Sequence, residues 1–354
     1  MYKTHTHLGF AAAVLAAVLA VAGCGGSGRT QTSSVAGVQT SQSRSSSALV
    51  GAGSTLVAPL VGAWQSDYSK SHGVQISYGA IGSGGGIAQI SARTVDFGAS
   101  DAPLTADQKA GCQGCVMVPW ALAATTVAVN VPGVTGHLKL TGPVVADIYL
   151  GKITTWNDPA IRKLNPGLKL PAQRIAPVYR SDGSGDTYAF TDYLSHVSPA
   201  FKAKMGGAST QVSWPVGTGA KGNAGVAATV EQTPGAIAYV AIAQAEGSHL
   251  NVALIRNRAG RYPVPAPATI AAAAVGARFR PDNSVSIVDS SGADAYPIAT
   301  FTSAIVSRSS SKLAELKRFL DYAVTTGQKV APQLAFAPLP KAVVAKDEAI
   351  VKAL

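Results

Sequence analysis

The segment from Arg180 to Thr187 constrains this chain more than any other, because it places a guanidinium, two serine hydroxyls and two glycines directly before an apolar helical pattern. The first N–H groups of a helix have no partner inside the helix and together carry about half a positive charge. Glycines let an anion approach that backbone closely, and an arginine adds a charged fork. The segment therefore predicts a seat for an oxyanion at the start of a helix.

Two further loops have the same character, because Gly51–Thr55 and Gly82–Gly86 each lead into an apolar, helix-like segment. A single Gly/Ser loop usually marks an ordinary turn. Asp101 follows a short apolar run and precedes Pro103, which is typical of a strand end facing a crevice, although Asp101 alone would be interpreted as a loop-capping residue. In combination, the three loops and Asp101 predict one shared anion site.

The apolar residues alternate between the helical and the strand period along the chain. Helical spacing is found in Leu60, Val61, Trp64 and Tyr68 and in Ile87 and Ile90, and strand-like patterns in Val74, Ile76 and Tyr78 and in Thr125–Val131. The alternation continues in Val144–Leu150, Ile175–Val178, Ala189–Leu194, Gly225–Val230, Ala236–Val240 and Val285–Val288, and then in a strand at Ile298–Val306 and a helix through Leu313–Tyr322. Strands separated by helices predict α/β layers with parallel sheets.

The chain resembles the phosphate-binding protein of the phosphate-specific ABC importer, the PstS family, from about Val50 to near the C-terminus. The segments that carry the resemblance are Gly51–Pro59, Ile81–Ile90, Val95–Leu104, Asp147–Trp156, Leu164–Pro171, Arg180–Leu194, Lys221–Ala228, Pro234–Val240 and Tyr296–Thr300. The resemblance implies a two-lobed, periplasmic-binding-protein-like α/β fold of type II with the ligand in the cleft between the lobes. Lobe I would comprise residues 48–129 plus 298–354, and lobe II residues 130–297.

The resemblance also implies which residues contact phosphate. They are Thr55, the amide of Leu56, Ser83, Asp101, Arg180, Ser184, Gly185 and, at a position where this chain departs from the family, Asp186. The family commonly has a threonine there, whose hydroxyl and amide both contact phosphate. We expect Asp186 to be a first-turn helix aspartate with its side chain in solvent and its amide toward the ligand. The alternative is a second carboxylate acceptor in the cleft, which predicts a preference for dihydrogenphosphate.

Asp101 would give such a site its selectivity. An ionised carboxylate accepts a hydrogen bond only from a protonated oxygen, which hydrogenphosphate has and sulfate lacks at neutral pH. A site that requires a hydrogen on the ligand can discriminate against an anion without one by roughly four to five orders of magnitude in affinity, because buried polar groups are left unpaired. We expect Arg180 to pair with Asp101 or with the anion.

The N-terminus has the features of an export signal. Lys3 precedes an apolar run from Leu8 to Gly23 that is too short to span a bilayer. The run ends before Cys24 in a sequence that resembles the bacterial lipobox, so residues 1–23 are a predicted lipoprotein signal peptide and Cys24 a lipidation site, with an ordinary cleavage site as the alternative. Residues 24–47 are mostly small and polar and predict a flexible tether. We expect an extracytoplasmic protein anchored to the bacterial cell membrane.

The other two cysteines, Cys112 and Cys115, form a Cys-x-x-Cys pair. Export favours a disulfide. A thioredoxin-like pair would begin a helix, whereas the strand-like run Val116–Pro119, which the proline is expected to end, follows here. We predict a structural disulfide, with free thiols and redox or metal chemistry as alternatives.

Motifs for other functions are weak. Ser184 is not in a Gly-x-Ser-x-Gly elbow, the histidines lack catalytic or metal-ligand spacing, and Gly217–Gly222 lacks the Gly-Lys-Ser/Thr of a nucleotide loop. The formal net charge is +11, but the basic residues are dispersed, so nucleic acid is not an expected partner. The sequence predicts a non-enzymatic solute-binding lipoprotein, without cofactor or metal, that captures inorganic phosphate and delivers it to an ABC permease. The alternatives are a binder of another oxyanion, a secreted phosphatase or a phosphate-sensing envelope protein.

Overall fold

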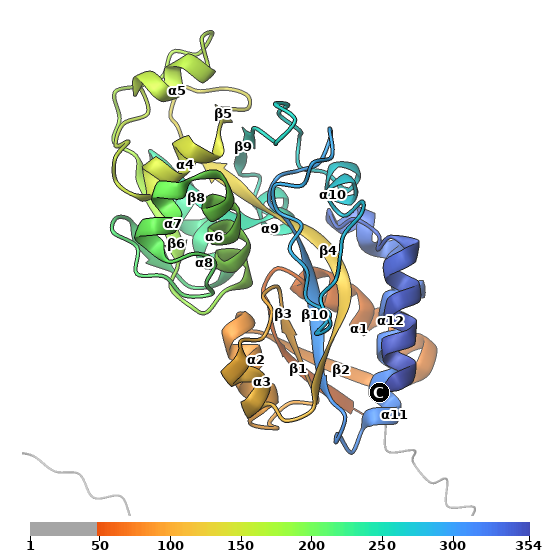
Figure 1. Ribbon diagram of the computed structural model, residues 1–354. Coiled ribbons are helices and arrows are strands. Elements are labelled where there is room, and N and C mark those ends of the chain that lie inside the picture. The colour runs from red at the N-terminus through yellow and green to blue at the C-terminus, as the bar shows by residue number, and fades with distance from the viewer. Residues whose placement is uncertain (1–47) are drawn as a thin grey trace, which may run out of the picture. The chain divides into compact units, whose positions relative to one another are not determined.

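The computed structural model describes residues 48–354 (Figure 1). The predicted signal peptide, the lipidation site Cys24 and the tether at 24–47 lie outside the described residues. Among the helices of the described part, none is long and apolar enough to cross a membrane.

The strands follow one path of hydrogen-bonded neighbours, β2-β1-β3-β10-β4-β8-β6-β7, with β9 also paired to β4 and β5 paired to β9. Their bounds are β1 (Ala48–Gly53), β2 (Gln75–Ala80), β3 (Phe97–Ser100), β4 (Cys115–Val129), β5 (Lys139–Leu140), β6 (Ala176–Arg180), β7 (Thr218–Ala220), β8 (Ala236–Ala241), β9 (Asn251–Ile255) and β10 (Ala299–Ser307). We call β1, β2, β3 and β10 the first strand group, and β6, β7 and β8 the second strand group. Within them β1 is parallel to β2 and β3, and β6 is parallel to β7 and β8.

The predicted α/β class is confirmed, but the sheet is mixed, because β4 and β10 are antiparallel to their neighbours. The α-helices are α1 (Ala58–His72), α2 (Ser83–Ser91), α3 (Ala106–Gly111), α4 (Gly142–Tyr149), α5 (Pro159–Leu164), α6 (Gly185–Val197), α7 (Pro199–Met205), α8 (Gly222–Gln232), α9 (Ile242–Gly247), α10 (Pro267–Ala273), α11 (Leu313–Val324) and α12 (Lys341–Ala353), and Thr326–Leu334 is a 3-10 helix. Helices α2 and α8 are packed against the first and second strand groups respectively.

The long strand β4 connects the two strand groups, as the yellow arrow in Figure 1 shows. It pairs with β10 as far as Ala124 and with β8 from Thr125 onward. The expectation that Pro119 ends this strand is wrong, because β4 continues to Val129. At Pro119 the register with β10 shifts, between Thr302 and Ser303 of β10. Such a bulge disrupts the ladder locally, and a proline is tolerated at this kind of position.

One predicted segment falls outside the secondary structure. Val285–Val288 contains no helix or strand. The backbone just before it is closed into a local turn, because the amide of Arg280 donates to the carbonyl of Ser284 at 2.8 Å. The other helix and strand patterns overlap helices or strands of the structure and extend at most two residues beyond them.

Two aromatic clusters consolidate the core. They are Trp64, Phe97, Trp120 and Phe319 beside the first strand group, and Tyr149, Phe190, Trp214 and Tyr239 beside the second. Ring centroids lie 5.2 Å apart for Trp64 and Trp120, and 4.5 Å apart for Phe190 and Tyr239. Each strand group therefore has its own aromatic packing, and such rings bury roughly 150–250 Å² each.

Cys112 and Cys115 are joined by a disulfide. The bridge closes the short turn between the end of α3 and the start of β4. Arg93 donates hydrogen bonds to the carbonyls of Cys112 and Gln113 at 3.2 and 2.9 Å, which ties this turn to the end of α2. The surroundings are those of a structural loop closure.

Asp347 on α12 gives a test of the packing around β4. Its side chain is buried, and neither carboxylate oxygen has a hydrogen-bond partner among the described residues. Burial raises the pKa of Asp347 from 3.8 to about 8, although Lys346 acts to lower it. The folded state therefore holds a proton that the unfolded chain releases, so the contribution of this group to stability is full below about pH 4 and is lost as the pH rises toward 8.

We expect Asp347→Asn to raise the free energy of unfolding by about 1–3 kcal/mol above pH 8, with a smaller difference toward pH 4. Denaturant titrations across this pH range measure the effect. Glu348→Gln, at an exposed position on the same helix, is the control. Equal stability of the Asp347→Asn variant and the wild type at high pH would contradict the assignment.

Candidate anion-binding site

The three Gly/Ser loops singled out in the sequence meet at one place in the structure. The amide of Gly185, the first residue of α6, donates to Oγ of Ser83, the first residue of α2, at 3.1 Å. The amide of Gly84 donates to the carbonyl of Gly183 at 2.9 Å. Ser54, after β1, donates to Asp101 at 2.7 Å. The starts of two helices and the ends of β1 and β3 therefore surround a common centre.

Glycine is required where these loops touch. A Cβ atom at Gly185 would lie 2.4 Å from both Cβ and Oδ2 of Asp101. Gly82 has φ +89°, in the left-handed region, and a Cβ there would lie 2.3 Å from Oδ2 of Asp182. The backbone at Gly185 and Gly82 therefore lies closer to the carboxylates of Asp101 and Asp182 than a residue with a Cβ atom would allow.

Asp101 lies buried at the end of β3 and is held by hydroxyl groups. Its Oδ2 accepts hydrogen bonds from Ser54 at 2.7 Å and from Ser83 at 3.4 Å, and its Oδ1 accepts one from Thr302 of β10 at 2.6 Å. Burial, together with the nearby charge of Asp186, raises the pKa of Asp101 to about 7, although the hydroxyl donors lower it. The carboxyl is therefore poised to exchange a proton near neutral pH.

Arg180 does not pair with Asp101, contrary to one of the two partners expected from the sequence. Its Nε donates to Oδ1 of Asp182 at 2.7 Å, and its Nη2 donates to Oδ2 of the same residue at 2.5 Å. The other terminal nitrogen, Nη1, donates to Oδ2 of Asp186 at 3.1 Å. Only Ser181 lies between Arg180 and Asp182 in the turn that ends β6, and the two hydrogen bonds form a bidentate fork. Burial would raise the pKa of Asp182, but the hydrogen bonds and charge of Arg180 hold it below its usual value.

The expectation that the Asp186 side chain points into solvent is wrong. The residue is 1% exposed. Its Oδ1 accepts from Thr125 of β4 at 2.7 Å, and its Oδ2 accepts from Arg180 and from Nδ2 of Asn223 at 2.8 Å. The first turn of α6 faces β4 and α8, so a first-turn side chain points inward. Burial raises the pKa of Asp186, while Arg180, Thr125 and Asn223 lower it.

The remaining predicted contacts lie around the same centre. Oγ1 of Thr55 accepts from Asn223 at 2.8 Å, and the amide of Leu56 donates to Oγ of Ser54 at 3.1 Å. Ser184 is the N-cap of α6, and its Oγ accepts from the amide of Thr187 at 3.3 Å. The structure thus brings together all the residues that the resemblance singled out.

Five residues of this network were not predicted as site residues, namely Ser54, Thr125, Asp182, Asn223 and Thr302. Ser54 and Asp182 lie inside two of the Gly/Ser loops, and Asn223 lies inside the segment Lys221–Ala228 of the family resemblance. A local signal was therefore present for these three. Thr125 and Thr302 are ordinary strand threonines whose role depends on the pairing of β4 and β10.

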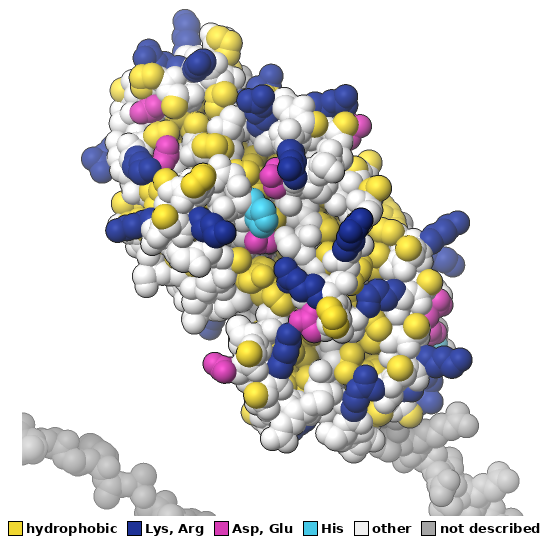
Figure 2. Space-filling view, viewed as in Figure 1, with side chains coloured by type: hydrophobic (Ala, Val, Ile, Leu, Met, Phe, Trp, Pro, Cys, Tyr) yellow, Lys and Arg dark blue, Asp and Glu magenta, His cyan; other side chains and the backbone are white. Residues whose placement is uncertain are grey.

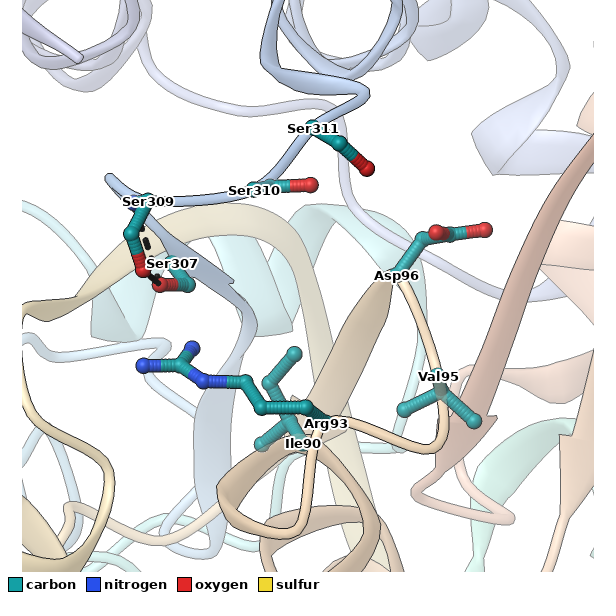
Figure 3. Close-up of a pocket in the computed structure, with 8 residues that line it drawn as sticks. All are labelled: Ile90, Arg93, Val95, Asp96, Ser307, Ser309, Ser310 and Ser311. Carbon is teal, nitrogen blue, oxygen red and sulfur yellow. Dashed lines mark hydrogen bonds between the residues drawn. The ribbon is translucent and has the colours of Figure 1, made fainter.

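A separate hollow of about 300 Å³ lies at the opposite end of β3, lined by Arg93, Asp96 and four serines (Figure 3). Asp96 already accepts hydrogen bonds from Lys312 and from the amide of Val50, both at 2.8 Å. Arg93 is committed to the carbonyls beside the disulfide, as described above. Both charged groups are held by structural contacts, and none of the residues that the resemblance assigns to phosphate lines this hollow, so the centre around Asp101 is the better candidate site.

The surface charge offers no stronger alternative on the face that Figure 2 shows, where Lys and Arg side chains are scattered among polar and apolar ones. This agrees with the dispersed basic residues of the sequence. A positive net charge of this kind favours encounters with any anion without selecting one.

Comparison with known proteins identifies the family to which this chain belongs. The sequence-family model for the PBP superfamily domain matches residues 36–326 of this chain. The chain is 42% identical over 305 residues to the phosphate-binding protein PstS of Xylella fastidiosa (strain Temecula1), covering 84% of this chain and 83% of that protein. It is 40% identical over 307 residues to PstS of Pasteurella multocida (strain Pm70), covering 85% and 89%. The crystal structure of a phosphate-binding protein from Stenotrophomonas maltophilia has a TM-score of 0.63 at 20% identity and covers 86% of this chain and 94% of that one.

The chain therefore belongs to the PstS family of phosphate-binding proteins, within the PBP superfamily. The predicted family and the α/β, periplasmic-binding-protein-like fold class are confirmed. Members of this family are solute-binding proteins.

The contact between Gly185 and Asp101 gives a test of this geometry. We expect Gly185→Ala to lower the free energy of unfolding by about 1–3 kcal/mol, because the added methyl group must displace a short, buried and hydrogen-bonded carboxylate. Gly62→Ala is the control, since a Cβ at that position of α1 meets nothing within 4 Å, and it should add about 0.5–1 kcal/mol. A Gly185→Ala variant as stable as the wild type would show that the approach is looser.

Proposed function

We propose that this chain is an extracytoplasmic solute-binding protein that captures inorganic phosphate between two lobes and delivers it to an ABC permease. The observation that carries the proposal is the buried carboxylate of Asp101, set among hydroxyls and helix starts in a chain 42% identical to a phosphate-binding protein. The proposal includes lobe I at residues 48–129 plus 298–354 and lobe II at 130–297. It also includes a lipid anchor at Cys24, and no bond of the ligand is made or broken.

The charges of the site favour an anion that carries protons. Asp182 and Asp186 pair with Arg180, and the carboxyl of Asp101 feels the charges of both Asp186 and Arg180, so carboxyl groups outnumber the one guanidinium. A fully deprotonated oxyanion would bring more acceptors to these carboxylates. A protonated one donates hydrogen bonds to them, and leaving such buried groups unpaired costs about 1–3 kcal/mol or more each. Phosphate near neutral pH meets this requirement and sulfate does not.

The donors of the proposed site come from both strand groups. In this proposal Thr55, Ser83 and Ser184 donate hydroxyl hydrogen bonds, Leu56 and Gly185 donate amide hydrogen bonds, and Arg180 supplies positive charge. Several of these donors bond neighbouring site residues in the structure, such as Gly185 to Ser83. A bound anion would replace those partners. Because both strand groups contribute, the ligand stabilises their contact.

Calorimetric titration of phosphate into protein that has been unfolded and refolded, with and without a large excess of sulfate, tests the function. We expect tight one-to-one binding that sulfate leaves unchanged. Effective competition by sulfate would overturn the assignment of phosphate. So would phosphate that gives neither heat nor protection against thermal unfolding.

Asp186 makes a second prediction possible. As a second acceptor it would favour dihydrogenphosphate, and the rising charge of Asp101, whose pKa is about 7, opposes an anion as the pH increases. We therefore expect phosphate affinity to fall between about pH 6 and about pH 9, and to fall less steeply in Asp186→Thr. Asp321→Thr, at an exposed position on α11, is the control for loss of one negative charge. Identical pH profiles in wild type and Asp186→Thr would show that Asp186 does not read a ligand proton.

A further inference from the structure

Asn223, the second residue of α8, joins the two strand groups at the proposed site. Its Nδ2 donates one hydrogen bond to Oγ1 of Thr55, after β1, and one to Oδ2 of Asp186, in α6, both at 2.8 Å. Its Oδ1 accepts from the amide of Ala241 at 2.8 Å. The residue is 2% exposed. Both hydrogens of the amide are therefore committed, one toward each strand group.

The orientation of this amide is fixed by its partners. The backbone N–H of Ala241 can only donate, so the side-chain atom that faces it must be the oxygen. The nitrogen then faces Thr55 and Asp186, and it can only donate. The neighbouring residue reinforces this placement, because the amide of Gly222 donates to Oδ1 of Asp182 at 3.0 Å.

This fixed donor determines the direction of the Thr55 hydroxyl. A hydroxyl has one hydrogen and can both donate and accept. Because Oγ1 of Thr55 accepts from Asn223, its own hydrogen points elsewhere and stays available to donate to an anion. On the other side, Asn223 and Arg180 both donate hydrogen bonds to Oδ2 of Asp186. Neither of these N–H groups can accept a hydrogen bond, so both favour the ionised form of the carboxyl.

We propose that Asn223 is a positioning residue for the anion site. It turns the Thr55 hydroxyl toward the ligand as a donor, favours the ionised form of Asp186 by donating to it, and links the two strand groups through one side chain. This role rests on the proposed function. Asn223 acts through Thr55 and Asp186 and is not itself assigned a ligand contact.

Isosteric replacement separates this role from packing. Asn223→Asp keeps the volume and the acceptor for Ala241, but it replaces the donor with an acceptor beside Asp186. We expect it to weaken phosphate binding more than Asn223→Ala does, and to recover in part as the pH falls and the new carboxyl gains a proton. For Asn223→Ala we expect a rise in the dissociation constant of about 10- to 100-fold, which is the effect of leaving buried partners unpaired. If Asn223 only filled space, the Asp variant would show no loss of affinity and the same pH dependence as the wild type.

Asn257 provides a matched control. It is also buried, and its side chain makes three hydrogen bonds, two to the carbonyls of Ala293 and Ala295 and one from the amide of Arg261. None of these partners belongs to the proposed site. We expect Asn257→Ala to lower the melting temperature while leaving the phosphate dissociation constant within about twofold of wild type.

A double-mutant cycle with Thr55 tests the route of the effect. If Asn223 acts in part through the Thr55 hydroxyl, the fold-loss caused by Asn223→Ala is smaller in a Thr55→Val background than in the wild type. Should Asn223→Ala fail to fold, Asn223→Ser, which keeps one donor, takes its place in the cycle and must still weaken binding.

The outcomes distinguish this inference from the proposed function. Wild-type protein that does not bind phosphate contradicts the proposed function and this role with it. Wild-type binding with unchanged dissociation constants in the Asp and Ala variants contradicts the positioning role alone. Equal fold-losses in the two backgrounds of the cycle contradict its route through Thr55.

Discussion

The burial of two carboxylates, with a third partly buried, beside one guanidinium is the constraint on which the rest of this site depends. Arg180, whose side chain is 1% exposed, pairs with Asp182 and Asp186, and its charge also acts on the carboxyl of Asp101. Removing such charges from water costs several kcal/mol each unless donors replace the water. One arginine cannot satisfy three carboxylates. The chain therefore supplies neutral donors, and they come from widely separated elements.

These donors explain why the fold is built around β4. Thr125 of β4 and Thr302 of β10 each hold one carboxylate, and the two strands are paired with each other. The bulge in this pairing lies between Thr302 and Ser303, directly beside the residue that contacts Asp101. Strand β4 then continues into the second strand group, where Asn223 and Arg180 complete the network. The positions of the buried charges are thus set by strand pairing across the whole described part of the chain.

The parts of the site that could be predicted from the sequence are those with a local signal. Glycine and serine before an apolar helical pattern mark the start of a helix, so the local sequence predicts the loops that contain Ser83 and Gly185, while the assignment of these two residues as phosphate contacts comes from the family resemblance. The direction of Asp186 was predicted wrongly, because it depends on which side of α6 packs against β4 and α8. Thr302 could not have been identified from local sequence either, since it lies 201 positions along the chain from its partner Asp101. The partners of Arg180 could not be predicted either. Only the folded structure shows that Asp182, in the turn, and Asp186, in the first turn of α6, both bind its guanidinium.

Substitution of Asp101 by asparagine tests the central claim most directly, because it keeps the shape of the side chain and adds a donor. The measurement is the ratio of the dissociation constants for sulfate and phosphate in the wild type and in Asp101→Asn. We expect a ratio of about 10⁴ or more in the wild type and a fall of at least two orders of magnitude in the variant, since the amide no longer rejects an anion without protons. An unchanged ratio in a folded Asp101→Asn protein would contradict the claim that this buried carboxylate reads the proton of the ligand.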